Sequence, residues 1–284
     1  TDADAGAGAE LYGETEGVQL VDVQETGGDG DMPDDATEAL QKYDPENIST
    51  MPPVVVFPFA TRPIFPGIFQ PCEVIDQRLV QALTAAKASH HPYVGVFLPR
   101  NQETGDKGVD KDIVPIADAS ELHEVGTLAQ IMRLSPTPQG AQVLLMGGRR
   151  VTIDRVVGSP GSGDSPVLEV KVKEAKDEVE PAGADPSVAK AYAMEVMQTI
   201  KEILKLNPFF KEQMQMILER TEVHEAGKLA DFGAALTTAD AASLQSVLGT
   251  LNVVERIEKT LMLLKKELEL SKLQAEISKS VEDK

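Results

Sequence analysis

The sequence predicts a two-part α+β fold, in which a small closed or rolled β-structure is followed by an all-helical bundle that ends in one long helix. From Met51 to about Lys173, apolar residues recur with a period of two or in short β-branched runs, which is typical of strands. After Lys173 the apolar spacing becomes three and four, which is typical of helices. Residues 252–284 continue that spacing without a Gly or Pro to end it.

Six segments of the first part have the pattern of β-strands. They are residues 53–59, 93–98, 124–134, 141–146, 149–157 and 167–173. In the last of these, apolar and charged side chains alternate, as in a strand with one buried face. The third segment is expected to place four side chains on one face: Val125, Thr127, Ala129 and Ile131. The Pro- and Gly-containing residues 135–140 predict a hairpin between the third and fourth segments.

One helix is predicted within the strand-rich part. Asp76 is its expected N-cap, and its inner face carries Leu79, Leu83 and Ala86.

Four shorter helices are predicted after residue 186. Ser187 is the expected cap of the first, whose inner stripe is Val196, Ile200, Ile203 and Leu204. Asn207 and Pro208 separate it from a second helix with the stripe Phe210, Met214, Ile217 and Leu218. The third carries Leu229, Phe232 and Leu236, and the fourth carries Leu244, Val247 and Leu248 and ends at Gly249.

The final helix is predicted to start at Asn252, with Glu255 three residues later in a capping-box-like arrangement. Its stripe begins with Val254, Ile257, Leu261, Leu264 and Leu268 and then drifts to Leu270, Leu273, Ile277 and Val281. We expect the first half to pack on the bundle and the second half to project toward neighbouring subunits.

Composition divides the chain further. Residues 1–50 hold fourteen Asp or Glu and one Lys, so they carry −13 of the net charge of −19, and we expect an acidic disordered tail there. The β-rich domain is predicted at 51–175, a linker at 176–186, the bundle at 187–249 and the long helix at 252–284. The acidic balance argues against nucleic acid as a partner of this segment, because phosphate contact needs basic clusters. No apolar run reaches the roughly 20 residues that span a bilayer.

No catalytic, cofactor or metal site is predicted from the sequence. It has no phosphate-binding GxxxxGK[ST] loop, no GxSxG, no HExxH and no paired cysteines at zinc spacing. His90 and His91 are neighbours, and neighbours on a helix point about 100° apart, so a solvated helix end is the favoured interpretation. Cys72 is the one cysteine, which excludes an internal disulfide and suits a soluble protein of a reducing compartment. Cys72 is interpreted as a small buried hydrophobe.

Two apolar groups are candidates for contact with polypeptide. The segment RPIFPGIF (62–69) gathers Ile64, Phe65, Ile68 and Phe69 around a Pro-Gly turn. It is either a turn packed into the β core or an exposed patch that holds unfolded polypeptide. The methionines Met194, Met197, Met214 and Met216 either fill the helical core or adapt to irregular partners.

Several motifs in this order resemble the amino-terminal region of ATP-dependent Lon proteases of the mitochondrial type. They are RPIFPG (62–67), ELHEVGTLAQIM (121–132), GKLADFGAAL (227–236) and the leucine-spaced segment 244–284 with its KELELSKLQ pattern. The resemblance covers about residues 51–284. It implies a PUA-like β-rich pseudo-barrel followed by a helical bundle.

The resemblance also implies a function. In Lon-like proteases this region captures misfolded or damaged proteins and helps to assemble a homohexamer in the mitochondrial matrix. An ATPase part that binds ATP and Mg²⁺ and a serine protease part lie outside this segment, and the long helix is expected to lead toward them. Candidate assembly residues are Leu261, Leu264, Leu268, Leu273 and Ile277. The alternative is a stand-alone adaptor or binding module with no protease attached.

Overall fold

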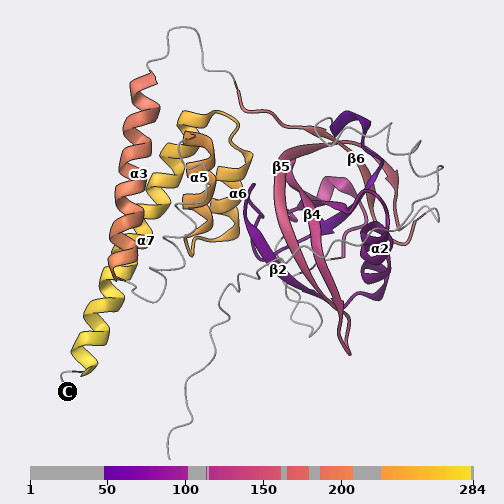
Figure 1. Ribbon diagram of the computed structural model, residues 1–284, viewed down its shortest axis with the longest axis horizontal. Helices are drawn as coiled ribbons and strands as arrows, with labels where there is room; N and C mark the ends of the chain where they lie inside the picture. Colours follow the sequence, from indigo (N-terminus) through magenta and orange to yellow (C-terminus); the bar gives the residue numbers. More distant parts are fainter. Residues whose placement is uncertain are drawn as a thin grey trace, which may run out of the picture. The chain divides into compact units, whose positions relative to one another are not determined.

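The computed structural model describes residues 48–101, 113, 115–160, 165–178, 186–206 and 225–282, all within one compact unit that spans residues 43–284 (Figure 1). The acidic segment up to residue 47 and the predicted helix around Phe210 lie outside the described residues.

Six strands form one sheet that closes on itself. Their bounds are β1 Val54–Pro58, β2 Phe69–Val74, β3 Tyr93–Phe97, β4 Val125–Pro136, β5 Ala141–Gly158 and β6 Glu169–Glu174. Their order is β2-β5-β4-β3-β1-β6, and β6 also pairs with β5. Closure depends on the length of β5, whose first half pairs with β2 and whose second half pairs with β6 (Figure 1). The expected pseudo-barrel is therefore confirmed. It is not a true barrel, because the one long strand β5, which has register shifts, pairs on two sides of the ring.

The β4–β5 hairpin is present, with a turn closed by the bond from Thr137 N to Gly140 O, 2.9 Å long. The segments 141–146 and 149–157, predicted separately, are parts of the single strand β5. The prediction that Val125, Thr127, Ala129 and Ile131 share a face agrees with the register. The shift between Leu128 and Ala129 adds its extra residue, Gly148, to β5 and leaves the alternation of β4 intact. Along this face Ala129 packs in the strand core, and Val125 packs with helical residues.

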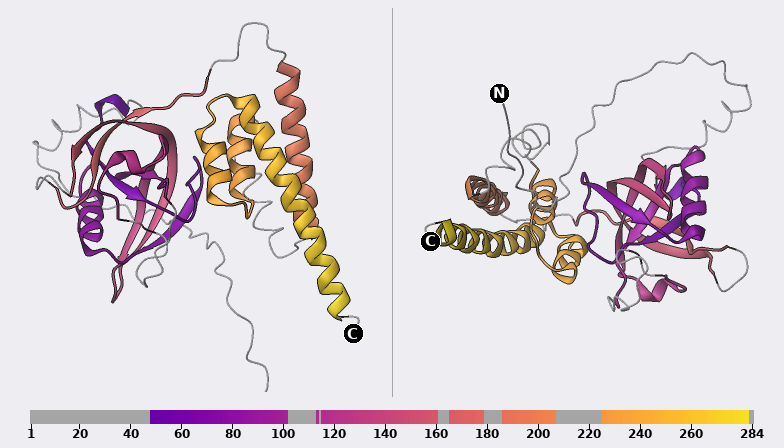
Figure 2. Two further views of the ribbon diagram at one scale, coloured as in Figure 1. Left: turned by 180° about the vertical axis from the view of Figure 1, so that it is seen from behind. Right: turned by 90° about the horizontal axis from the view of Figure 1, so that it is seen from below.

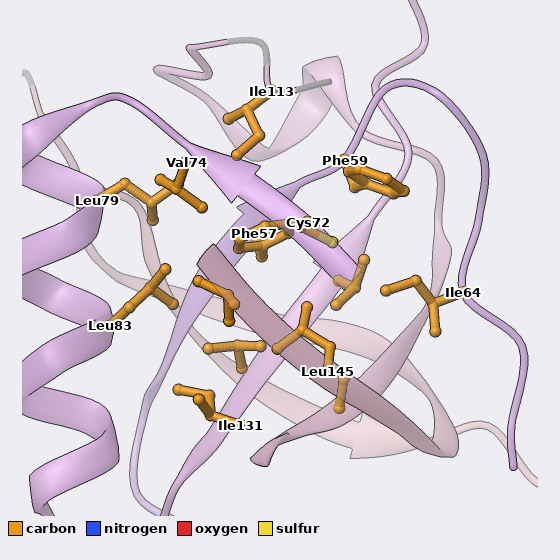
Figure 3. Packing of buried hydrophobic residues seen from close by; sticks show 14 of the residues in the cluster. Phe57, Phe59, Ile64, Cys72, Val74, Leu79, Leu83, Ile113, Ile131 and Leu145 are labelled. Atoms are coloured by element: carbon orange, nitrogen blue, oxygen red, sulfur yellow. The ribbon is translucent and has the colours of Figure 1, made fainter. Parts of the chain in front are cut away.

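Helix α2, Gln77–Ala88, covers one side of the main strand core (Figure 3). Its predicted cap is confirmed, because the Asp76 carboxylate accepts a hydrogen bond from Arg78 N. Leu79 and Leu83 point from this helix into the core, where Cys72 is also buried, as the sequence predicts (Figure 3).

The helical part contains four described α-helices. They are α3 Pro186–Leu206, α5 Ala226–Ala235, α6 Ala241–Gly249 and α7 Val253–Glu282, and the chain also has 3-10 helices η1 Ile48–Thr50 and η2 Ala119–Glu121. Helix α3 begins at Pro186, so Ser187 lies inside its first turn rather than capping it. The predicted stripes of α3 and α5 meet α7 in one cluster that includes Val196, Leu229 and Ile257. Among the described helices, none is both long and apolar enough to cross a membrane.

Helix α7 has two halves that differ in burial. Asn252 caps it by accepting a 3.0 Å hydrogen bond from Glu255 N, but the Glu255 side chain pairs with Lys259 instead of completing a capping box. Leu264 and Leu268 are buried against the bundle, as predicted. Beyond them the helix continues past the other helices (Figure 2), and its apolar side chains are exposed: Leu270, Leu273, Ile277 and Val281.

The strand part and the helical part share a buried cluster. Phe65 and Val125 pack there with Leu244, Val247 and Leu248 of α6. Gln245 adds a buried hydrogen bond from its Nε2 to Val125 O, 2.8 Å long. Side chains from both parts therefore pack in one continuous core at the joint between them.

Candidate functional site

The segment 62–69 is divided between the interior and the surface. Its predicted turn is present, because Ile68 N donates to Phe65 O at 3.2 Å and Gly67 has a φ of 77°. Ile64 is buried in the strand core, and Phe65 is buried against α6. These two side chains form part of the joint and are not available to a partner.

Polar bonds hold the same segment in place. Arg62 Nη2 donates a 2.9 Å hydrogen bond to Ala235 O at the end of α5. Burial lowers the pKa of Arg62. Thr127 Oγ1 donates a 2.6 Å hydrogen bond to Ile64 O inside the molecule. These bonds connect the segment with β4 and α5, and the burial of Ile64 and Phe65 accounts for much of its apolar character.

The remaining predicted contact residues are scattered. Ile68 is half-buried against both helical clusters, whereas Phe69 in β2 is 43% exposed. Met197 packs against the α3–α7 cluster, and Met194 on α3 is 66% exposed. Met214 and Met216 lie outside the described residues. The structure therefore does not assemble the methionines and the 62–69 segment into one surface within the described residues.

An apolar surface does form around Phe69, from residues of three strands. We call it the outer strip, and it consists of Phe69, Pro71, Met132, Leu144 and Met146. Phe69 is paired with Met146, and Pro71 with Leu144, between β2 and β5. Directly paired residues stand on the same face of a sheet. Met132 stands at a bulge in β4 and is 39% exposed. The alternate residues Cys72, Val143 and Leu145 face the core.

The β4 side of the outer strip is polar and cationic. Gln130 pairs with Met146, and Arg133 pairs with Leu144, on the β4 side. Lys87 Nζ donates to Ile131 O at 2.7 Å and to Met132 O at 3.1 Å, which fixes the bulge that presents Met132. The strip can thus hold apolar side chains of an extended chain, with hydrogen-bonding groups along one border.

Sequence reasoning found Phe69 but missed the other members of the strip. Residues 141–146 read as a nearly continuous apolar run, which predicts burial on both faces. The missing signal is that Leu144 and Met146 are only half-buried, whereas Val143 and Leu145 between and beside them are core residues. Pairing between β2 and β5 joins residues about 75 positions apart, so spacing alone could not connect them.

The described residues contain no group of three or more His, Cys, Asp or Glu that could hold a metal ion. A cavity of about 490 Å³ lies beside β1, the start of α2 and the segment before β6. Its walls are apolar apart from Asp76 and Arg78. Hydrogen bonding from the Arg78 side chain lowers the pKa of the Asp76 carboxyl. That carboxylate therefore acts as an ionised helix cap that is paired with Arg78 in the same cavity wall.

Comparison with known proteins adds the family context. A family model described as the ATP-dependent protease La (LON) substrate-binding domain matches residues 53–266. The mitochondrial Lon protease homolog of Zea mays is 37% identical over 251 residues, which cover 84% of this chain and 24% of that protein. The Lon protease of Protochlamydia amoebophila is 38% identical over 233 residues, 81% of this chain and 26% of that protein. The chain thus spans about a quarter of the length of these relatives.

A solved structure supports the fold. The N-terminal domain of a Mycobacterium avium complex Lon protease aligns with a TM-score of 0.53 at 20% identity. The alignment covers 75% of this chain and 98% of that domain.

Proposed function

The chain belongs to the family of ATP-dependent protease La (LON) substrate-binding domains, and we propose that it recognises the proteins that a Lon-like protease degrades. The observation that carries this proposal is the outer strip. It leaves Phe69 and Met132 about two-fifths exposed on a sheet face whose opposite side contributes Cys72, Val143 and Leu145 to the core. Binding of a partner that covers apolar groups in such a position is favourable, because it removes apolar surface from water.

The chemistry of the strip favours misfolded or damaged proteins as substrates. A folded protein buries most of its large apolar side chains, whereas an unfolded segment presents them along an extended chain. Phe69 and Met146 can contact one such side chain, and Pro71 and Leu144 can contact the next. Methionine adapts to partners of irregular shape, which suits a site that must accept many sequences. Met194 on α3 is a further candidate contact.

A second part of the proposal concerns assembly. Leu264 and Leu268 are buried within the chain's own bundle, so they stabilise α7 rather than contact another subunit directly. Leu273 and Ile277 are 56% and 61% exposed and are the better candidates for association between copies. In the whole protein, by family resemblance, this would contribute to a homohexamer in the mitochondrial matrix, with ATP and Mg²⁺ bound by the ATPase part.

Binding to one protein in two states tests the recognition role. Fluorescence anisotropy of labelled, reduced and carboxymethylated lactalbumin, which cannot refold, should rise on titration with the chain. The same protein with its disulfides intact should give little change. Equal responses to the two forms, or no response to either, would contradict a preference for unfolded polypeptide.

A further inference from the structure

Four charged side chains form one connected row across the joint between the strands and the helices. Arg150 of β5 donates from Nη1 to Asp231 Oδ2 of α5 at 2.8 Å and from Nη2 to Asp231 Oδ1. Arg256 of α7 donates from Nη1 and Nη2 to the two carboxylate oxygens of Asp177, both at 2.8 Å. Arg256 Nε lies 3.8 Å from Asp231 Oδ1, and this contact links the Arg256–Asp177 pair to the Arg150–Asp231 pair.

Burial differs sharply along this row. The side chains of Arg150, Asp231 and Arg256 are 6%, 4% and 1% exposed, whereas that of Asp177 is 47% exposed. The buried part therefore holds two guanidinium groups and one carboxylate. Asp177 supplies the charge that neutralises the second guanidinium, and it does so from the surface.

Backbone contacts place Asp177 on the joint. Ala175 N donates to Arg150 O at 2.9 Å, and Glu178 N donates to Leu251 O at 3.1 Å. Composition predicts a linker from residue 176. In the structure, backbone hydrogen bonds join residues 175–178 to β5 at one end and to the α6–α7 connection at the other. Arg150 Nε also donates to Leu248 O at 2.9 Å, which includes the end of α6 in the same network.

We infer that Asp177 is the release point of a clasp, formed by Arg150, Asp231, Arg256 and Asp177, that holds α7 and the strand part together as one rigid body. Water and ions can compete for the Asp177 carboxylate, but they have no access to the Arg150–Asp231 pair. Once Asp177 leaves, Arg256 keeps a buried charge that shares a single carboxylate with Arg150. An uncompensated buried charge is unstable, so the first turn of α7 must move to hydrate it. This inference holds whichever polypeptide the chain binds.

Distance measurements on the full chain test the clasp. Spin labels at Ala85→Cys in α2 and Glu258→Cys in α7 would report the separation of the two parts, because both positions are exposed and Cys72 is buried. The wild-type background should give one narrow distance distribution. Asp177→Asn should broaden or shift it and should lower the thermal midpoint by roughly 5 °C or more. Glu269→Gln removes the exposed Glu269–Lys272 pair and should change neither.

A second variant opens the clasp without removing a charge. A Cβ on Gly227 would lie 2.7 Å from Arg256 Nη2 and 3.3 Å from Asp177 Oδ2. Gly227→Ala should therefore push the guanidinium from Asp177 and broaden the distribution as Asp177→Asn does. Gly249→Ala is the control, because a Cβ there meets no atom within 4 Å. A wild-type distribution in Asp177→Asn or in Gly227→Ala would overturn the clasp.

Discussion

Phe69 of β2 lies directly opposite Met146 of β5 on the outer face of the sheet, while Cys72 and Leu145 of the same strands belong to the buried core. The pair is the centre of a surface that no single motif encodes. Among the described helices, α2 packs on the core side of this sheet and α6 packs beside β4, and Phe69 is 43% exposed.

The packing of α5 against α7 predicts a steric limit at Gly233. A Cβ there would lie 2.9 Å from Thr260 Cγ2 and 3.1 Å from Leu264 Cδ1, and both of these side chains are fully buried. Gly233→Ala should lower the free energy of unfolding by about 1–3 kcal/mol, although alanine ordinarily favours a helix by about 1 kcal/mol. Urea unfolding followed by circular dichroism measures this. Gly249→Ala, in open space, should be as stable as wild type or more stable. Equal stability of the two variants would refute the close approach.

The bond from Thr127 to Ile64 predicts a cost for losing one hydroxyl. Thr127 is fully buried, and in Thr127→Val the carbonyl of Ile64 would lose this donor inside the protein. The expected loss is about 1–3 kcal/mol in the free energy of unfolding. Thr84→Val is the matched control, because Thr84 Oγ1 donates to Val80 O on the exposed face of α2. The control should stay within about 0.5 kcal/mol of wild type, and an equally small effect at Thr127 would contradict the role given to its hydroxyl.

The cap of α2 predicts a pH dependence. The Arg78 side chain lowers the pKa of Asp76 in the folded chain, so the unfolded chain binds the proton more readily. The resulting stabilisation is present above about pH 4, the ordinary carboxyl range, and is lost as pH falls through the folded-state pKa. Asn keeps the capping oxygen but does not titrate. The urea midpoint should therefore fall less between pH 5 and pH 3 in Asp76→Asn than in wild type. An identical fall in both proteins would exclude Asp76 as a contributor.

The exposed half of α7 predicts concentration-dependent self-association. Replacing Leu273 and Ile277 by Asp should lower the associated fraction in sedimentation velocity and leave the thermal midpoint unchanged, because both side chains are exposed. Gln274→Asp controls for added negative charge on the same exposed stretch. Leu264→Asp is unsuitable as a test, since Leu264 is fully buried and its loss would disrupt the bundle. Unchanged sedimentation of the double variant would remove α7 as an assembly element.

Local patterns in the sequence predicted most of the elements. The cap at Asp76, the hairpin around residues 135–140 and the buried face of α7 up to Leu268 all follow from short-range spacing. These features depend on neighbours within one or two turns, which the sequence displays directly.

Long-range relationships could not be predicted in the same way. The register shift beside Leu128 makes Gly148 an extra residue of β5, within the strand that joins the separately predicted segments 141–146 and 149–157. Arg149 and Arg150 together resemble an ordinary charged surface segment, yet Arg150 is buried in β5 and its partner Asp231 lies 81 residues later in helix α5. Phe65 appeared in the sequence as a candidate contact, but tertiary packing buries it against α6.

The role of the outer strip is tested most directly by comparing two double variants that each replace two exposed apolar strand residues by threonine. Phe69→Thr with Met132→Thr removes the most exposed large side chains of the strip. Val156→Thr with Val157→Thr removes two valines that are each 46% exposed in the distant half of β5. Threonine suits strands in both places.

The measurement is the dissociation constant for carboxymethylated lactalbumin, obtained by anisotropy for wild type and both variants. Covering two large apolar side chains contributes at least about 1.4 kcal/mol, which corresponds to a tenfold change. The strip variant should therefore bind about tenfold more weakly or worse, while the valine variant binds as wild type does. Wild-type affinity in the strip variant, or an equal loss in both variants, would contradict the outer strip as the substrate-contact surface.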